Sequence, residues 1–330
     1  MPAINIAIIM GGYSSEKDIS LQSGEIVYKN LQAAGHNVYK AHILESGWNV
    51  VLDSGKALPI NKSDFSFKDR DTTIIPDVVF NVIHGTPGED GYMQAYLELI
   101  GIPQTSSDFY AAALSFNKRD SLSVLKNFGV KCANSYYVNQ GAIPPLEDII
   151  KTVGLPCFVK PNRAGSSFGI SKVYTLEELP AALEKAFKED SEVLVETCLV
   201  GTEVSVGVYK TFGETHVLPP TEIVSENDFF DYEAKYLGQS EEITPARISE
   251  EAQKRVMAET KRIFTLLNAK GIARCDFILQ DDVPYFLEIN TNPGLSAESI
   301  IPRQARYIQL SLSTLFSDLV QTVLPNNNNS

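Results

Sequence analysis

The sequence lacks the features that mark several classes of protein. Its four cysteines, Cys132, Cys157, Cys198 and Cys275, lie far apart and form no CxxC pair. This spacing argues against a zinc or redox site and favours reduced thiols in a cytosolic protein. No run approaches the roughly 18 apolar residues that a membrane span requires, and the N-terminus has no basic segment followed by a long apolar one. We therefore expect a cytoplasmic protein with no membrane partner.

Positive charge is also scarce. The 330 residues include 28 Lys and Arg against 41 Asp and Glu, a formal net charge of −13. No nucleic-acid partner is expected, because a phosphate backbone requires clustered cations. A single nucleotide needs only a few well-placed cations. Neither a P-loop GxxxxGK[ST] nor a GxGxxG after the first strand occurs, which excludes the P-loop and Rossmann classes.

Apolar strands and amphipathic helices alternate along the first 118 residues. Ser15 with Asp18 resembles a helix cap, and Gly35 resembles a helix stop. Strands are expected at 4–10, 38–43 and 77–83, and helices at 19–34 and up to residue 100. This order predicts an open parallel α/β domain at residues 1–118.

The rest of the chain predicts two α+β units, at residues 119–212 and 213–330. The first is expected to hold a hairpin at 156–174 with a tip rich in glycine and serine. In the second, Ser249 caps a long helix that ends at Gly271, and the strands 272–280 and 284–290 form another hairpin. The polar stretch 225–247 shows no convincing helix or strand and is long enough to be a lid.

The last hairpin carries the strongest site signal. A turn centred on Asp282 places Asp276 opposite Glu288. The same register places Arg274 opposite Asn290, on the same face. Facing carboxylates repel unless a cation lies between them, and two carboxylates with an amide oxygen suit Mg²⁺ bound together with phosphates. The alternative is a solvated strand face. The metal site is favoured because the alternate positions are apolar: Cys275, Phe277, Leu287 and Ile289.

A second signal is the loop between Pro161 and Gly169. Its glycines, with Ser166 and Ser167, could bend over phosphate oxygens, although such a tip is usually just a turn. Lys160 strengthens the signal, because an unpaired ammonium in an apolar strand is costly and a phosphate would satisfy it. Lys118 is a second candidate phosphate ligand, and a solvated helix face is equally compatible with it.

A series of motifs follows in order along the chain. They are Gly11-Gly12 with Ser15-Glu16, His84-Gly85 with Gly88-Glu89-Asp90-Gly91, Lys160-Pro161 with Gly165-Ser166-Ser167, residues 231–236 (DYEAKY), Arg274-Cys275-Asp276 and residues 288–294 (EINTNPG). In order and spacing, these motifs resemble those of the D-alanine–D-alanine ligase family of ATP-grasp enzymes over about residues 4–320. The resemblance implies an ATP-grasp fold of three domains, with an ATP-grasp region at about 122–324, and a homodimer. It also implies that ATP is used with two Mg²⁺ ions, or Mn²⁺, to join two D-alanine molecules for peptidoglycan synthesis.

The resemblance also assigns residues by position. Catalytic roles would belong to Glu16, Ser166, Tyr236, Arg274 and Ser299. ATP would be bound by Lys118, Lys160, Ser167, Glu196, Leu199, Glu203, Lys235 and Asn290. The substrate would contact Glu16, His84, Gly294, Ser299 and Ile300, and the metal ligands would be Asp276, Glu288 and Asn290. The chain departs from the family pattern at Lys17 and Thr197, and at Glu298, where the family usually has histidine before the serine.

Several assigned residues have plainer roles available. Glu16 at a helix start is favoured by the helix dipole alone, and His84 could be an ordinary loop histidine. Ser299 could be a helix cap, and Tyr236 could serve simply to pack a closed loop. Two other functions compete: a ligase with another acceptor such as D-lactate, and a nucleotide-binding protein without catalysis. The Lys235-Tyr236 pair favours an amine acceptor, and the intact set of candidate metal ligands favours catalysis.

Overall fold

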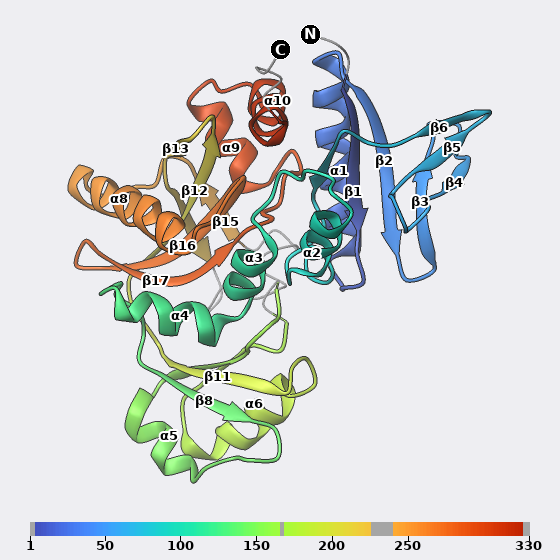
Figure 1. The fold of residues 1–330 in the computed structure, drawn as a ribbon. Helices are drawn as coiled ribbons and strands as arrows, with labels where there is room; N and C mark the ends of the chain where they lie inside the picture. Colours follow the sequence, from blue (N-terminus) through green and yellow to red (C-terminus); the bar gives the residue numbers. More distant parts are fainter. Residues whose placement is uncertain (1–3, 166–167, 226–239, 326–330) are drawn as a thin grey trace.

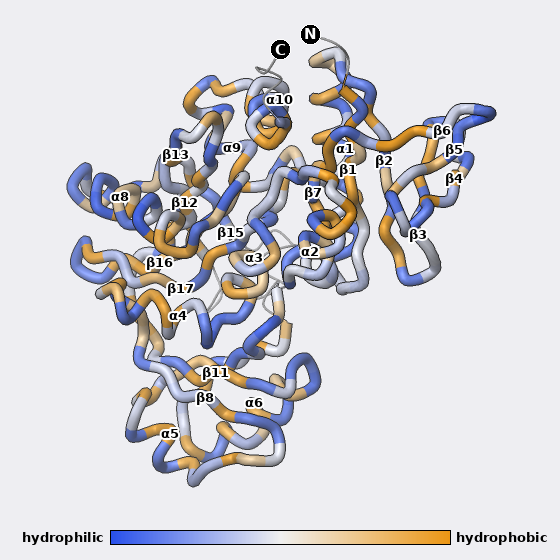
Figure 2. Tube along the Cα trace, viewed as in Figure 1, coloured by the Kyte–Doolittle hydropathy of each residue, from blue (hydrophilic) through white to orange (hydrophobic). Residues whose placement is uncertain are grey.

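A computed structural model describes residues 4–165, 168–225 and 240–325. It contains both helices and sheets, arranged as three units around a common centre (Figure 1). Hydrophilic segments, blue in Figure 2, are frequent at the outer edges, for example around α8, and each unit has its own buried apolar cluster. None of the helices in the described ranges is long and apolar enough to cross a membrane.

The first unit is a five-stranded sheet in the order β4-β3-β2-β1-β7. Its strands are β1 (Asn5–Gly11), β2 (Asn37–Leu44), β3 (Gly47–Val51), β4 (Ala57–Pro59) and β7 (Val78–Asn81). The helices α1 (Lys17–Ala33), α2 (Tyr92–Leu99) and α3 (Phe109–Phe116) and a small ribbon of β5 (Phe67–Asp69) and β6 (Thr72–Ile74) complete it. The sheet is parallel at β2-β1-β7, as predicted. It is antiparallel at β2-β3-β4, because β2 and β3 are joined by a tight turn that the sequence interpretation missed.

The start of α1 differs from the prediction. Glu16, not Ser15, occupies the N-cap position, and no side chain caps the helix. The hydroxyl of Ser14 instead accepts a hydrogen bond from the Glu16 N–H at 3.3 Å and donates one to the His84 carbonyl at 2.8 Å. These bonds tie the start of α1 to the loop after β7, so Glu16 and His84 are held at the same edge of the sheet.

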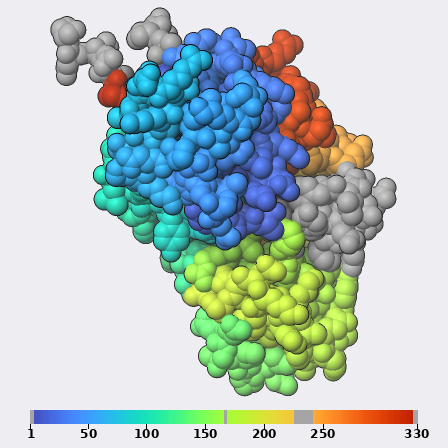
Figure 3. Space-filling view, turned by 90° about the vertical axis from the view of Figure 1, so that its right-hand side faces the viewer, coloured from blue at the N-terminus to red at the C-terminus, as the bar shows by residue number. Residues whose placement is uncertain are grey.

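The middle unit is a four-stranded sheet in the order β10-β9-β11-β8. Its elements are β8 (Ser135–Asn139), α5 (Leu146–Val153), β9 (Cys157–Pro161), β10 (Ser171–Val173), the 3₁₀ helix η1 (Leu176–Glu178), α6 (Leu179–Ala186) and β11 (Glu192–Thr197). The predicted hairpin is present as the antiparallel pair β9-β10. Figure 3 shows this unit, in green and yellow, as a lobe below the blue first unit.

The third unit is a six-stranded sheet, with β15-β14-β12-β16-β17 in order and β13 paired to β12. Its strands are β12 (Thr202–Thr211), β13 (Glu214–Val217), β14 (Thr221–Ser225), β15 (Ser240–Ile243), β16 (Ile272–Gln280) and β17 (Val283–Asn290). The helices are α8 (Glu250–Leu266), α9 (Ile300–Tyr307) and α10 (Leu312–Val323), and α4 (Lys118–Asn127) packs against the same core. Ser249 caps α8 by accepting from the Ala252 N–H, as predicted.

Two features of this unit differ from the sequence interpretation. The stretch 225–247 contains the strand β15, which pairs with β14 and was missed, while residues 226–239 lie outside the described residues. β12 falls in the range 119–212 that was expected to form the middle unit, but it pairs with β14 and β16. The three-domain division stays a prediction, with β12 belonging by its pairing to the third unit.

The C-terminal helix packs against the N-terminal unit. Leu315, Phe316, Leu319 and Val320 of α10 share one buried cluster with Ile6 and Ile8 of β1 and with Val27 and Leu31 of α1. The rings of Phe80 and Phe316 meet edge to face, with centroids 5.5 Å apart. The first and last parts of the chain are therefore joined through a common core, as Figure 1 shows at α10 and α1.

Candidate active site

A cavity of about 970 Å³ lies where the three units meet. Every predicted site residue within the described ranges lines it: Glu16, His84, Lys118, Lys160, Glu196, Leu199, Glu203, Arg274, Asp276, Glu288, Asn290, Gly294, Ser299 and Ile300. Ser166, Ser167, Lys235 and Tyr236 lie outside the described residues. One cavity thus gathers side chains that are up to 284 positions apart in the sequence, as the difference between Glu16 and Ile300 gives.

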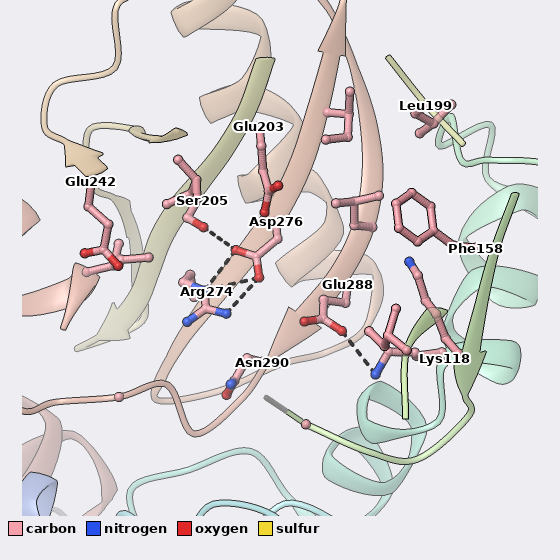
Figure 4. A pocket seen from close by; sticks show the side chains of 18 of the residues that line it. Lys118, Phe158, Leu199, Glu203, Ser205, Glu242, Arg274, Asp276, Glu288 and Asn290 are labelled. Carbon is pink, nitrogen blue, oxygen red and sulfur yellow. Dashed lines mark hydrogen bonds and ion pairs between the residues drawn. The ribbon is translucent and has the colours of Figure 1, made fainter. Parts of the chain in front are cut away.

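The β16-β17 hairpin supplies the acidic wall of this cavity. Asp276 pairs with Glu288 and Arg274 pairs with Asn290, as predicted (Figure 4). The predicted turn, centred on Asp282, was wrong. Asp281 and Asp282, both at positive φ, form a two-residue turn. In a regular hairpin this turn would not place Glu288 opposite Asp276.

A β-bulge restores the predicted pairing. The register shifts between Asp276 and Phe277, and Phe277 pairs with Phe286, so Leu287 has no partner opposite it. As a result the consecutive residues Leu287 and Glu288 both line the cavity, although side chains of a regular strand alternate. The prediction that Leu287 belongs to the opposite, buried face was therefore wrong.

Asp276 is fixed by two neighbours on the same sheet. The Arg274 guanidinium donates to both of its oxygens, from Nε at 2.9 Å and from Nη2 at 2.8 Å. The Ser205 hydroxyl, from β12, donates to Oδ1 at 2.6 Å. Burial alone would lower the pKa of Arg274, but the Asp276 carboxylate raises it well above its usual value. Arg274 is therefore charged where it contacts Asp276.

Glu288 is paired with a lysine from another part of the chain. Lys118 Nζ lies 3.1 Å from Glu288 Oε2 and donates to the Ala164 carbonyl at 2.9 Å. Lys118 begins α4, whose N-cap Asn117 accepts from the Asp120 N–H. Because the first turn of α4 is capped in this way, the lysine is held at the junction of the second and third units.

Lys160 is also paired. The sequence interpretation suggested a phosphate as the partner of this ammonium, and in the structure its Nζ lies 2.8 Å from Glu196 Oε2. Glu196 comes from β11, next to β9 in the sheet. Burial opposes the charge of Lys160, and the Glu196 carboxylate more than offsets this and raises the pKa of Lys160. In Figure 4 Leu199 and Phe158 lie on this side of the cavity, away from Arg274.

A group of titratable side chains from the first unit closes another end of the cavity. The Gly85 N–H donates to Glu89 Oε2 at 2.6 Å. Burial, with the nearby charge of Glu16, raises the pKa of Glu89 to about 8. Burial lowers the pKa of His84, against the effect of Glu16. A Cβ at Gly165 would lie 2.5 Å from Glu16 Oε2, so a larger residue there would displace the Glu16 carboxylate from its present position.

The start of α9 also lines the cavity. Ser299 is at the N-cap position, but its side chain makes no capping bond and its hydroxyl lies 2.7 Å from that of Ser296. A Cβ at Gly294 would lie 2.8 Å from Ser299 Oγ, so these residues are tightly packed. Helix N-termini attract anions, and two hydroxyls beside one make this end suited to a carboxylate.

The cavity contains residues that the sequence interpretation did not assign: Phe158, Lys172, Ser205, Glu242 and Glu89. Two had a usable signal. Ser205 alternates with Glu203 along a strand and so shares its face, and Glu89 lies inside the Gly88–Gly91 motif. Glu242 was hidden because its strand was taken for part of a loop.

The donor chemistry of the acidic wall fits a divalent metal. Asp276, Glu288 and Asn290 offer only oxygen ligands from one sheet face, the preference of Mg²⁺. In the structure lysine and arginine neutralise these carboxylates, and no group of three or more His, Cys, Asp or Glu side chains with metal-binding geometry occurs among the described residues. The residues therefore fit a metal whose remaining ligands come from substrate.

Comparison with protein families decides the family. The model of the D-Ala–D-Ala ligase N-terminus matches residues 5–107, and that of the D-Ala–D-Ala ligase C-terminus matches residues 124–321. The chain belongs to the D-alanine–D-alanine ligase family. It is thus one of the ATP-dependent ligases, which use ATP with a divalent metal. The expected ATP-grasp fold class is confirmed.

Individual relatives agree with this assignment. The chain is 56% identical over 320 residues to a D-alanine–D-alanine ligase of Flavobacterium johnsoniae, covering 97% of this chain and 99% of that one. It is 53% identical to one of Christiangramia forsetii, covering 97% and 98%. Among solved structures, the VanG D-Ala:D-Ser ligase of Enterococcus faecalis has a TM-score of 0.87 at 33% identity, covering 97% of this chain and 99% of that one.

Proposed function

We propose that this protein is a D-alanine–D-alanine ligase. The carboxylate of one D-alanine attacks the γ-phosphorus of ATP, giving an acyl phosphate and ADP. The amine of a second D-alanine, having lost its extra proton, attacks the acyl carbon, and phosphate leaves as the peptide bond forms. The observation that carries the proposal is the cavity itself. In a chain of this family, it brings three mostly buried cations and two facing carboxylates together with a helix end suited to a carboxylate.

The cations suit phosphoryl transfer, in which most catalysis is positioning and charge stabilisation. Lys118 and Lys160 would bind ATP phosphates, giving up their pairs with Glu288 and Glu196. Glu203 and Leu199 would hold the nucleoside. Two Mg²⁺ ions, held by Asp276, Glu288 and Asn290, would offset charge on the phosphates.

The first D-alanine would bind at the Glu16 end. Glu16 would pair with its ammonium, close to His84. Arg274, with a backbone N–H near Gly294, would stabilise the oxyanion formed when the amine attacks. Ser166 and Tyr236 are proposed to complete this end, and Ser167 and Lys235 to contact ATP, all by family position.

The second D-alanine would place its carboxylate at Ser299 and the first turn of α9, beginning at Ile300. A D-lactate acceptor is the competing function, and the relatives named above are not of that type. The homodimer, the cytoplasmic location and the role in peptidoglycan synthesis are parts of the same proposal, supported by the family resemblance.

The test is direct. Purified protein with ATP and Mg²⁺ is expected to release phosphate with D-alanine, and to form D-alanyl-D-alanine in equal amount. L-alanine should give neither. Phosphate release with L-amino acids but not with D-alanine would overturn the proposal. With D-alanine and D-lactate in competition near neutral pH, the amide should greatly exceed the ester.

A further inference from the structure

The carboxylate-binding end of the cavity is itself acidic. Glu298, directly before Ser299, and Glu242, from β15, both line the cavity. The Glu242 side chain is mostly buried, with 21% of it exposed, whereas that of Glu298 is 79% exposed. In Figure 4 Glu242 lies on the opposite side of Arg274 from Leu199, at the far end from the nucleoside side. Two carboxylates beside a site for a third would repel it.

Arg303 contacts both of these glutamates. Its Nη2 lies 3.1 Å from Glu298 Oε2, and its Nε lies 3.5 Å from Glu242 Oε2. Its Nε also donates to the Glu298 carbonyl at 2.9 Å. The guanidinium therefore lies between β15 and the loop that carries Ser299, without lining the cavity itself.

The position of Arg303 is unfavourable for the helix that carries it. It is the fourth residue of α9, near the N-terminus, where the macrodipole disfavours a cation. Its two acidic partners come from outside α9, so the contacts join separate segments and do not serve the helix alone. An arginine placed here has its clearest physical effect on the charge around Ser299.

We propose that Arg303 is a positioning residue for the second substrate. By holding Glu298 and Glu242, it offsets one of the two negative charges at this end of the cavity and lets the acceptor carboxylate bind at Ser299. The inference rests on the proposed function, and it adds a residue that touches no substrate. It also explains how a glutamate can stand at position 298, although it has the same charge as the carboxylate that binds next to it.

Three variants test the proposal, with phosphate release measured against D-alanine concentration to give a Michaelis constant for each amino-acid site. Arg303→Met should raise the Michaelis constant of the acceptor site about tenfold, because the carboxylates of Glu298 and Glu242 would then repel the acceptor carboxylate without a cation beside them. The constants for ATP and the first D-alanine should stay within about twofold. Arg306→Met is the matched control: it removes the same charge from α9, and the Arg306 side chain donates to the Ala297 carbonyl of the same loop and forms no ion pair with a carboxylate among the described residues.

The double variant Arg303→Met/Glu298→Gln separates charge from structure. It should recover most of the acceptor affinity, because one negative charge is removed with the positive one. If Arg303 acted only by holding the two segments together, the double variant would keep the raised acceptor constant. Glu298→Gln alone, at an exposed side chain, should lower the acceptor constant about twofold, and rising salt should weaken the Arg303→Met effect. If Arg303→Met fails to fold, the sign of the Glu298→Gln effect still decides.

An unchanged acceptor constant in Arg303→Met, no recovery in the double variant, or a raised constant in Glu298→Gln would each overturn the inference. These outcomes presuppose that the wild type makes D-alanyl-D-alanine. If it does not, the proposed function fails first, so the two failures are distinguishable.

Discussion

Asp276 and Glu288 face each other across the β16-β17 ladder, and each carboxylate contacts a different cation. Arg274 holds Asp276, and Lys118 holds Glu288 from across the junction with the second unit. The two cations differ in their other hydrogen-bond partners. Lys118 also donates to a backbone carbonyl, whereas both nitrogens by which Arg274 is bonded go to Asp276. Glu288 is therefore the carboxylate more readily freed for a metal.

Glu288→Gln should abolish most activity while leaving the fold intact. Neutralising one oxygen ligand weakens divalent-metal binding, which supplies several kcal/mol of charge stabilisation, so turnover should fall about a hundredfold or more. Phosphate release across a Mg²⁺ titration measures this. Wild-type activity over the whole titration would show that Glu288 is no metal ligand, and thermal unfolding without metal would confirm that the variant is folded.

The Lys160–Glu196 pair predicts a difference between a single and a double variant. Lys160→Met leaves the Glu196 carboxylate, only 5% exposed, without its partner and should cost about 3–5 kcal/mol of unfolding free energy. Lys160→Met/Glu196→Gln should regain most of that stability. Neither should bind ATP normally, because both lack the lysine. Urea denaturation and nucleotide binding measure the two effects, and a double variant no more stable than the single one would contradict the prediction.

Glu89 predicts a pH dependence of stability. Its pKa in the folded protein is about 8, above the usual value of 4.5, so the folded state binds the proton more tightly than the unfolded state. Its contribution to the free energy of unfolding is complete below about pH 4.5 and is lost as the pH rises to about 8. Glu89→Gln should remove this loss. The melting temperature of the variant, relative to wild type, should rise between pH 5 and 8.5, and parallel profiles would show that Glu89 is not protonated there.

Ser205→Ala tests the support of Asp276. Loss of a buried hydrogen bond to a charged acceptor should cost about 1.5–3 kcal/mol of stability, and turnover should fall about tenfold as Asp276 loses its orientation. Ser123→Ala is the matched control, because that hydroxyl bonds to a helix carbonyl in an exposed position. Equal effects of the two substitutions would leave Ser205 with no particular role.

The sequence predicted the elements best where apolar periodicity was strong and long. The bounds of β16 were predicted without error, and Ser249 caps α8 as expected. The short strands β3 to β6 were missed, because three to five residues carry too little periodicity to stand out.

The residues that line the site were easier to predict than the pairs that they form. The Asp276–Glu288 pairing was right only because a bulge at Leu287 offsets the shorter turn, and no sequence pattern marked that bulge. Glu196 could not be matched to Lys160 because the two lie on different strands, whose order in the sheet is set by tertiary packing. Arg303 was missed since one of its two acidic partners, Glu242, comes from a strand far from it in sequence.

The packing of α10 on α1 and β7 has a consequence for synthesis of the chain. The core of the first unit includes Leu315, Phe316, Leu319 and Val320, which are made last. While the ribosome still holds these residues, one face of the N-terminal sheet is only partly covered, by α1, although all of its strands have already emerged. The unit that is translated first is thus among the last to be completed. A stop codon just before Leu312 should therefore expose the N-terminal half to chaperones and proteases, far from the site of the lesion.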